Sequence, residues 1–235
     1  MEQRIPQSIL VVNPNCLSAV TQSMSAALDA FRLAGAPEIR CETLENGPPG
    51  IETQAHVDDA AAKLAQYFSD RSARKQADAY VIACFSDPGV LALREILKAP
   101  VYGIGEASYL AAAALGGNFG VIAIVSRGIA RHERAQRALG IHHKLAGEIA
   151  IDLPVAELQK EELVWKRMSA VGARLRDERG AQSIIMGCAG MARYRTRLEE
   201  HLGVPVIDPT QVAVGMAMSM LLARRAGAGE KRAAA

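Results

Sequence analysis

The chain has 235 residues, of which half are hydrophobic and 22% are charged, and it carries a net charge of +2 at pH 7. These are ordinary values for a globular protein with one large or two small domains. The weak charge and the 4% of aromatic residues argue against nucleic-acid binding, which needs a basic surface and stacking rings.

No apolar segment has the length of a membrane span. The first apolar run, residues 9–12, stops at Asn13 and is too short for a signal peptide or a bilayer-crossing helix. The longest run, residues 212–223, is interrupted by a glycine and a serine, which is typical of a buried helix. We therefore expect a cytoplasmic protein that does not bind membranes.

Cysteine spacing gives no support for a metal or redox motif. The chain has four cysteines: Cys16, Cys41, Cys84 and Cys188. No two of them form a C-x-x-C pair, so neither a zinc site nor a dithiol motif is indicated. In the cytoplasm all four should be reduced thiols.

Strand-like and helix-like segments alternate in the first half. Short apolar runs predict strands at residues 9–12, 40–44, 80–84 and 101–104. Apolar residues at helical spacing predict helices at residues 20–31, 57–70, 88–97 and 108–115. This alternation predicts a parallel sheet covered by helices on both faces.

After Gly116-Gly117 the same order of elements starts again. Strands are predicted at residues 119–125, 149–152, 183–187 and 205–208. Helices are predicted up to residue 139 and at residues 154–178, 194–202 and 210–224. We therefore predict an α/β fold of two similar lobes, each a short, mostly parallel sheet flanked by helices. A pseudo-twofold axis would relate the lobes, with the active site in the cleft between them.

The repeat also sets the expected boundaries. The first lobe is predicted to span residues 1–117 and the second residues 118–209. The helix at residues 210–224 should pack back onto the first lobe, and residues 226–235 read as a frayed tail.

Two cysteines stand at matching places in the repeat. Cys84 ends a strand in the stretch YVIACFSDPG, and Cys188 does so in IIMGCAGM. Ligands bind beyond the carboxyl ends of parallel strands, so the two thiols can face each other across the cleft. Each precedes a helix start, where the thiolate is favoured. A single strand-end cysteine is more often a packing residue, but two at equivalent positions favour chemistry.

Six motifs in order carry a family resemblance. They are Asn13-Pro14-Asn15, CFSDPG, PVYGIGEAS at 100–108, VIAIVSRG at 121–128, GCAGM, and GVPVID at 203–208. Together, over residues 8–224, they resemble the aspartate/glutamate racemase superfamily, and most closely its hydantoin and allantoin racemase branch. The resemblance implies a cofactor-independent, two-base racemase with one cysteine on each face of the acidic carbon. By motif, those are Cys84 and Cys188.

Two positions depart from the family pattern. Cys16-Leu17 stands where the family usually has Thr-Ser, and Ser86 stands where it usually has glycine. Both lie beside the expected pocket, so they affect the prediction of the substrate more than the prediction of the reaction type.

An enolate formed from the substrate needs hydrogen-bond donors. The candidates are the backbone N–H groups of Phe85, Ser86 and Ala189 and the side chains of Asn13 and Ser126. Arg127 can meet a substrate carboxylate. For Asn13 and Ser126 a turn or cap role is the alternative, and for Arg127 a solvated position.

The expected reaction is racemisation of a 5-substituted hydantoin or of allantoin, both cyclic ureides. The ring C–H is acidic because its carbanion becomes an enolate, so neither a metal nor pyridoxal phosphate is expected. Alternatives on the same fold are an arylmalonate-type decarboxylase, which uses one cysteine, and a maleate-type cis–trans isomerase. A non-catalytic small-molecule binding protein is a further alternative. Alanine-rich exposed helices predict a homo-oligomer.

Overall fold

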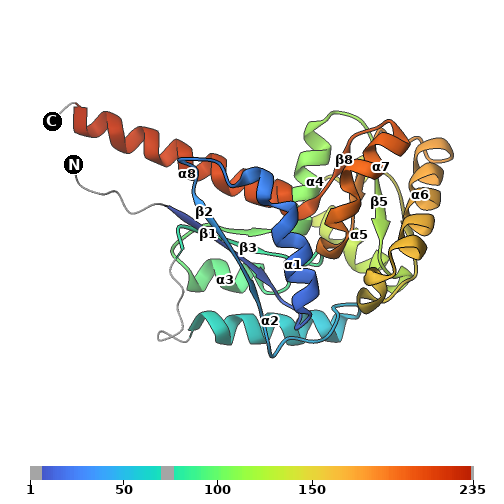
Figure 1. Ribbon diagram of the computed structural model, residues 1–235, viewed down its shortest axis with the longest axis horizontal. Helices are drawn as coiled ribbons and strands as arrows, with labels where there is room; N and C mark the ends of the chain where they lie inside the picture. The colour runs from blue at the N-terminus through green and yellow to red at the C-terminus, as the bar shows by residue number, and fades with distance from the viewer. Residues whose placement is uncertain (1–6, 70–76, 234–235) are drawn as a thin grey trace.

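The computed structural model describes residues 7–69 and 77–233, with side chains described through Arg224. Its described strands form two four-stranded sheets, one in each lobe (Figure 1). The first sheet contains β1 (Ser8–Asn13), β2 (Glu38–Thr43), β3 (Ala79–Ile82) and β4 (Val101–Gly103). The second contains β5 (Phe119–Ala123), β6 (Leu145–Ala150), β7 (Ser183–Met186) and β8 (Val206–Ile207).

The two sheets have the same topology. Their strand orders are β2-β1-β3-β4 and β6-β5-β7-β8, and every pairing is parallel. The second half of the chain therefore repeats the first, strand for strand. The predicted α/β fold of two similar lobes is confirmed.

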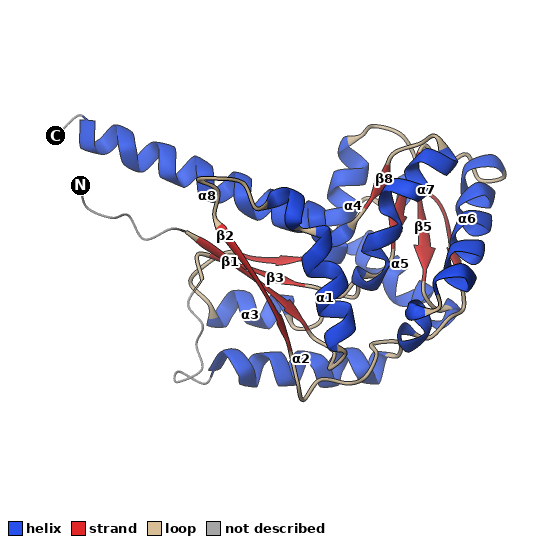
Figure 2. Ribbon diagram, viewed as in Figure 1, coloured by secondary structure: helices blue, strands red, loops and turns tan. Residues whose placement is uncertain are grey.

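Helices cover both faces of each sheet (Figure 2). In the first lobe they are α1 (Ser18–Ala27), α2 (Gln54–Ser69), α3 (Val90–Ile96) and α4 (Ile104–Ala114). In the second they are α5 (Ile129–Ala138), α6 (Glu161–Asp177) and α7 (Arg195–Leu202), and α8 (Pro209–Ala233) ends the chain's described part. Short 3-10 turns are η1 (Asp29–Phe31), η2 (Ser126–Gly128), η3 (His142–Lys144), η4 (Val155–Gln159) and η5 (Ala189–Tyr194).

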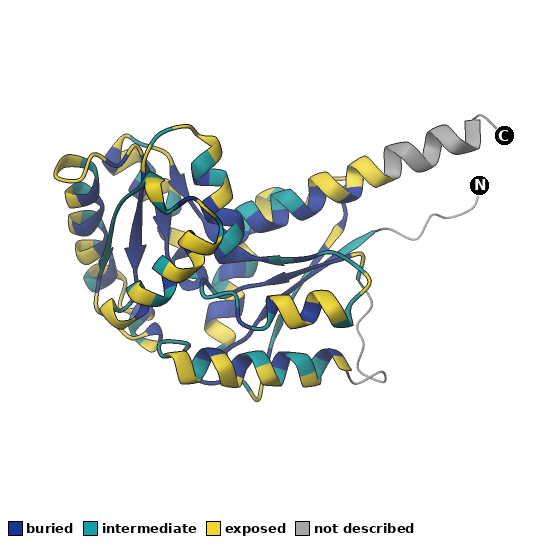
Figure 3. Ribbon diagram, turned by 180° about the vertical axis from the view of Figure 1, so that it is seen from behind, coloured by how far each residue is buried: buried dark blue, intermediate teal, exposed yellow. Residues whose placement is uncertain are grey.

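Strand alternation explains why each central strand is apolar throughout. In β1, Ile9 and Val11 pack on one face with α1, α4 and α8, while Leu10 and Val12 pack on the other with α2 and α3. A strand buried on both faces loses the polar alternation of a half-exposed strand. Figure 3 shows the same pattern, with the central strands buried and the helices exposed on their outer faces.

The helix predicted at residues 154–178 is interrupted. It divides into η4 and α6, because Lys160 between them has ψ near 76° and leaves the helical region. This break matters for the site, since it places Val155 at the interface of the two lobes. The strand β6 also begins at Leu145, earlier than predicted.

The last helix, α8, packs on the first lobe against α4, β1 and β3. Its buried side chains there include Ala213, Val214 and Ala217. The helix continues to Ala233, where the sequence suggested a frayed tail from residue 226, and residues 234–235 lie outside the described part. Within the described residues, no helix is both long enough and apolar enough to span a bilayer.

Candidate active site

Cys84 sits in a turn that is pinned to the start of α4. Ala83 still pairs with β1, and Cys84 is the first residue beyond that pairing. The Asp87 N–H then donates to the Cys84 carbonyl at 2.9 Å. The Asp87 carboxylate accepts from the Gly105 N–H at 2.8 Å and from the Glu106 N–H at 2.7 Å. This carboxylate therefore caps α4 and fixes the cysteine turn at once.

Cys188 occupies the equivalent place in the second lobe. The Gly187 N–H donates to the Ile122 carbonyl at 2.9 Å, which extends the pairing of β7 by one residue. A side chain at Gly187 would lie 2.7 Å from that oxygen, so glycine is required there. Cys188 is the N-cap of η5, and its Sγ accepts from the Gly190 N–H at 3.4 Å. The Met191 N–H donates to its carbonyl, as Asp87 does to that of Cys84.

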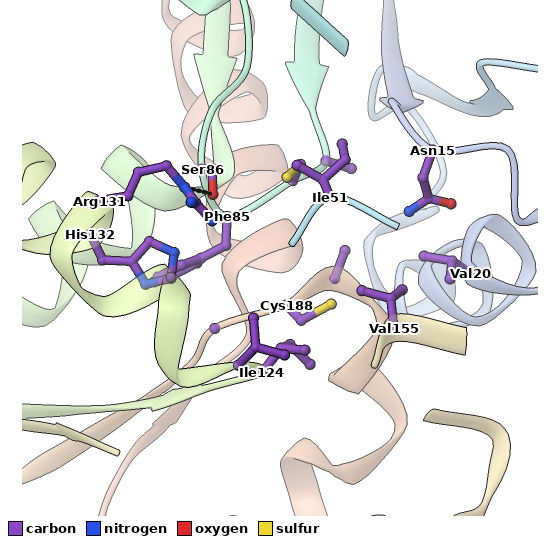
Figure 4. A pocket seen from close by; sticks show the side chains of 16 residues that line it. Asn15, Val20, Ile51, Phe85, Ser86, Ile124, Arg131, His132, Val155 and Cys188 are labelled. Atoms are coloured by element: carbon purple, nitrogen blue, oxygen red, sulfur yellow. Dashed lines mark hydrogen bonds between the residues drawn. The ribbon is translucent and has the colours of Figure 1, made fainter. Parts of the chain in front are cut away.

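Both cysteines line one pocket between the lobes. Figure 4 shows Arg131, His132, Phe85 and Ser86 on one side of it, and Val20, Ile51, Val155 and Asn15 on the other. The pocket therefore combines two thiols, a polar side and a mainly apolar side.

Three of the predicted binding residues line this pocket: Phe85, Ser86 and Ala189. The other three, Asn13, Ser126 and Arg127, are not among its lining residues. Ser126 and Arg127 form the exposed turn η2, and the Ser126 N–H donates to Asp152 Oδ1 at 2.8 Å.

Asn13 is fully buried in the turn after β1. Its amide donates to Asn15 Oδ1 at 3.1 Å, to the Leu17 carbonyl at 3.2 Å and to Thr21 Oγ1 at 3.0 Å. These bonds match the turn role that the sequence left open as the alternative. Asn15, two residues further on, reaches the pocket instead.

Sequence reasoning missed the residues that α5 contributes, Arg131 and His132. His132 Nδ1 lies 2.5 Å from Glu148 Oε1, and its ring meets that of Phe85 edge to face at 5.0 Å. Gly128, which also lines the pocket, is three and four residues before them, as expected for neighbours on one helix face. That spacing is the one feature of the sequence that could have indicated that Arg131 and His132 line the pocket.

Three hydrogen bonds connect the lobes around the pocket. Glu52 Oε1 accepts from the Val155 N–H at 3.0 Å. Gln54 Oε1 accepts from the Arg134 guanidinium at 3.1 Å, and Ser86 Oγ accepts from Arg131 Nε at 3.0 Å. The pocket is therefore closed by contacts between residues far apart in the sequence.

Comparison with known proteins identifies the family of the chain. The family model described as Asp/Glu/Hydantoin racemase matches residues 9–217. The chain belongs to this family.

Individual relatives cover nearly the whole chain. The hydantoin racemase of Rhizobium meliloti is 34% identical over 220 residues, covering 91% of this chain and 88% of that protein. The hydantoin racemase of Paenarthrobacter aurescens is 32% identical over 214 residues, covering 91% and 90%. Among solved structures, an allantoin racemase from Klebsiella pneumoniae superposes with a TM-score of 0.86 at 33% identity, covering 92% and 88%. The expected family, and with it an isomerase, is confirmed.

The surroundings of the two pocket thiols shift their pKa values. Burial raises the pKa of the Cys84 thiol to about 12. The hydrogen bond from the Ser86 N–H lowers this pKa, but its effect is smaller than that of burial. Burial likewise raises the pKa of the Cys188 thiol to about 11, against the lowering effect of the Gly190 N–H. The local N–H groups at the helix starts do favour the thiolates, as expected, but loss of solvent outweighs them and the net pKa of each thiol is raised.

Proposed function

We propose that this protein is a cofactor-independent racemase that inverts the acidic ring carbon of a 5-substituted hydantoin or of allantoin. Cys84 and Cys188 are its two acid–base groups. One observation carries the proposal: two thiols at equivalent strand ends of two similar lobes line a single pocket. The names of the relatives, hydantoin racemase and allantoin racemase, support the substrate class.

The chemistry needs a base on one face of the ring carbon and an acid on the other. In one direction, the Cys84 thiolate removes the proton and the Cys188 thiol delivers its own proton to the opposite face. The carbanion formed between these steps is an enolate, with its charge on the adjacent carbonyl oxygen. After turnover Cys84 is a thiol and Cys188 a thiolate, which is the form that acts on the opposite enantiomer.

The enolate oxygen requires donors inside the pocket. The backbone N–H groups of Phe85 and Ala189 stand next to the two cysteines and are the nearest candidates. The Asn13 side chain is not available for this role, because its amide is used within its own turn.

The pocket favours this reaction over the alternatives. A decarboxylase of the arylmalonate type needs one cysteine, and here a second lines the same pocket. A cis–trans isomerase of a diacid would bind two carboxylates. Among the residues that the structure describes, Arg131 is the one arginine or lysine of the pocket lining.

The test is direct. Purified protein, without added cofactor and with excess EDTA, should bring the optical rotation of either enantiomer of a 5-substituted hydantoin or allantoin to zero. Cys84→Ala and Cys188→Ala should each abolish this change, whereas Cys41→Ser, in β2 and outside the pocket, should keep it. Unchanged rotation of every substrate, or activity lost to EDTA and restored by a metal, would exclude the proposal.

A further inference from the structure

One side of the pocket carries a cation that the proposed mechanism has not used. Arg131 comes from the first turn of α5 and points toward the pocket beside Ser86 (Figure 4). Its side chain is half-buried, and its Nε donates to Ser86 Oγ at 3.0 Å. A guanidinium has further N–H donors beyond this one.

No carboxylate of the residues whose side chains are described forms a direct ion pair with this guanidinium, although Glu148 and Asp58 act on its charge from further away. The ion pairs found there do not involve Arg131, and Glu148 in β6 contacts His132, the next residue of α5, instead. A partly desolvated cation without a directly paired counter-ion is costly unless a ligand supplies negative charge next to it. Its surroundings therefore predict an anionic or strongly polarised group of the substrate.

Arg131 also lies within electrostatic reach of Cys84. Burial lowers the pKa of the guanidinium, and the Cys84 sulfur raises it. In return, the Arg131 charge is one of the effects that lower the pKa of Cys84, although burial dominates there. The same positive charge can thus favour the thiolate before proton transfer and the enolate after it.

The opposite side fixes which edge of the substrate faces Arg131. Val20 and Val155 are buried there, Ile51 is half-buried, and none of the three offers a polar side-chain atom. Asn15 is the polar side chain on that side, and its Oδ1 already accepts from Asn13 and from the Leu17 N–H. A hydrocarbon substituent fits this side, whereas the N–H groups of a ureido substituent would lose their acceptors.

We propose that Arg131 is a catalytic residue that binds the carbonyl next to the acidic ring carbon and receives its negative charge in the enolate. Ser86 is its positioning residue. The ring substituent then points to Val20, Ile51 and Val155, so a hydantoin with a hydrocarbon substituent is a better substrate than allantoin. Because Ser86 and Arg131 belong to different lobes, this electrophile is assembled only when the lobes are together. This inference rests on the proposed function.

The experiment compares variants of the full chain with 5-isopropylhydantoin. Arg131→Met should lower kcat by about 100-fold or more with a small change in KM, as loss of an oxyanion donor does. Solvent deuterium exchange at the ring carbon should fall by the same factor, because enolate formation itself is impaired. Arg131→Lys should recover part of the rate, and Ser86→Gly should lower kcat less than Arg131→Met. Arg137→Met, an exposed change on the same helix, is the matched control and should leave all rates unchanged.

The outcomes separate the two proposals. Thermal unfolding of each variant shows that it is folded, and wild type should show a higher kcat/KM for 5-isopropylhydantoin than for allantoin. A kcat of Arg131→Met within about threefold of the control, or an equal preference for allantoin, overturns the role of Arg131 and leaves the racemase in place. Failure of wild type to racemise either compound overturns the proposed function and this inference with it.

Discussion

Glu52 of the first lobe accepts a hydrogen bond from the backbone N–H of Val155 in the second lobe, with Oε1 and N 3.0 Å apart. Ile51, next to Glu52, lines the pocket together with Val155. Gly50 packs so closely here that a Cβ on it would lie 3.4 Å from Val155 Cβ. The segment before α2 therefore closes the pocket by docking on η4.

Breaking this contact should weaken closure rather than the chemistry. Glu52→Ala leaves the Val155 N–H without its partner, which costs about 1 kcal/mol. We expect kcat/KM to fall by roughly fivefold, since every 1.4 kcal/mol is a factor of ten. Glu52→Gln keeps a carbonyl acceptor and should retain most of the activity.

The control is Glu45→Ala, an exposed change on the same loop, which should be neutral. Steady-state kinetics and thermal unfolding measure both effects. Equal activity of Glu52→Ala and the control would show that the contact does not limit closure.

The sequence predicted the cysteines because their signal is local. An apolar strand followed by Cys84 or Cys188 and a turn can be recognised within ten residues. Arg131 and His132 could not be assigned this way, because helical spacing shows that α5 is a helix but not which face meets the other lobe. Val155 was missed for the related reason that the break at Lys160 has no strong breaker residue.

The net rise in the pKa of the two thiols could not be predicted from the sequence, for a physical reason of the same kind. A helix start next to Cys188 is visible in the sequence, and it does lower the pKa. The burial that raises it comes from both lobes together, which no local pattern contains. The effect of the helix start on the thiol was predictable from the sequence, whereas the loss of solvent around the thiol was not.

The raised thiol pKa values predict a specific pH dependence of stability. The unfolded chain loses cysteine protons near pH 8.5, whereas the folded protein keeps those of Cys188 and Cys84 to about pH 11 and 12. The folded state therefore binds more protons in this window. Because it does, the free energy of unfolding should fall as pH rises through it.

Urea unfolding between pH 8 and 11 measures this slope. The Cys84→Ser/Cys188→Ser double variant should show a shallower fall than wild type, and Cys41→Ser is the control for removing a thiol elsewhere. Absorbance near 240 nm should show thiolate forming later than in a free cysteine. Two buried thiols titrating at or below pH 8.5 would contradict the prediction.

Titration of the Asp87 carboxyl should make the stability of the turn that holds Cys84 depend on pH. Burial raises the pKa of its carboxyl to about 7, although the N–H groups of Gly105 and Glu106 lower it. Between pH 4 and 7 the folded state then binds more protons than the unfolded chain. The contribution of Asp87 to the free energy of unfolding should therefore be lost as pH rises through that range.

Asp87→Asn removes the titration and one of the two acceptors. It should destabilise the protein by about 1 to 3 kcal/mol and make the change in stability between pH 5 and 8 smaller than in wild type. Denaturant unfolding at both pH values measures this. Asp58→Asn, an exposed change in α2, should leave the wild-type pH dependence intact, and a parallel profile for Asp87→Asn would contradict the assignment.

The two-base geometry predicts that each single-cysteine variant exchanges the ring proton of one enantiomer only. Cys84 and Cys188 come from opposite lobes, so each thiol should serve one face of the ring carbon. Cys84→Ser should stop racemisation from both directions, because each turnover needs removal at one face and delivery at the other. The remaining Cys188 thiolate can still remove a proton on its own side and return a deuteron there.

Solvent exchange in Cys84→Ser should therefore persist for one enantiomer only, and in Cys188→Ser for the other. Serine adds little leakage, since its hydroxyl stays protonated near neutral pH. Proton NMR in deuterated buffer, with each pure enantiomer, follows loss of the ring C–H signal, and Cys41→Ser should exchange both enantiomers as wild type does. Equal exchange of both enantiomers by either single variant would mean that one thiol reaches both faces. The two lobes would then not divide the chemistry between them, and the repeat would serve only to build the pocket.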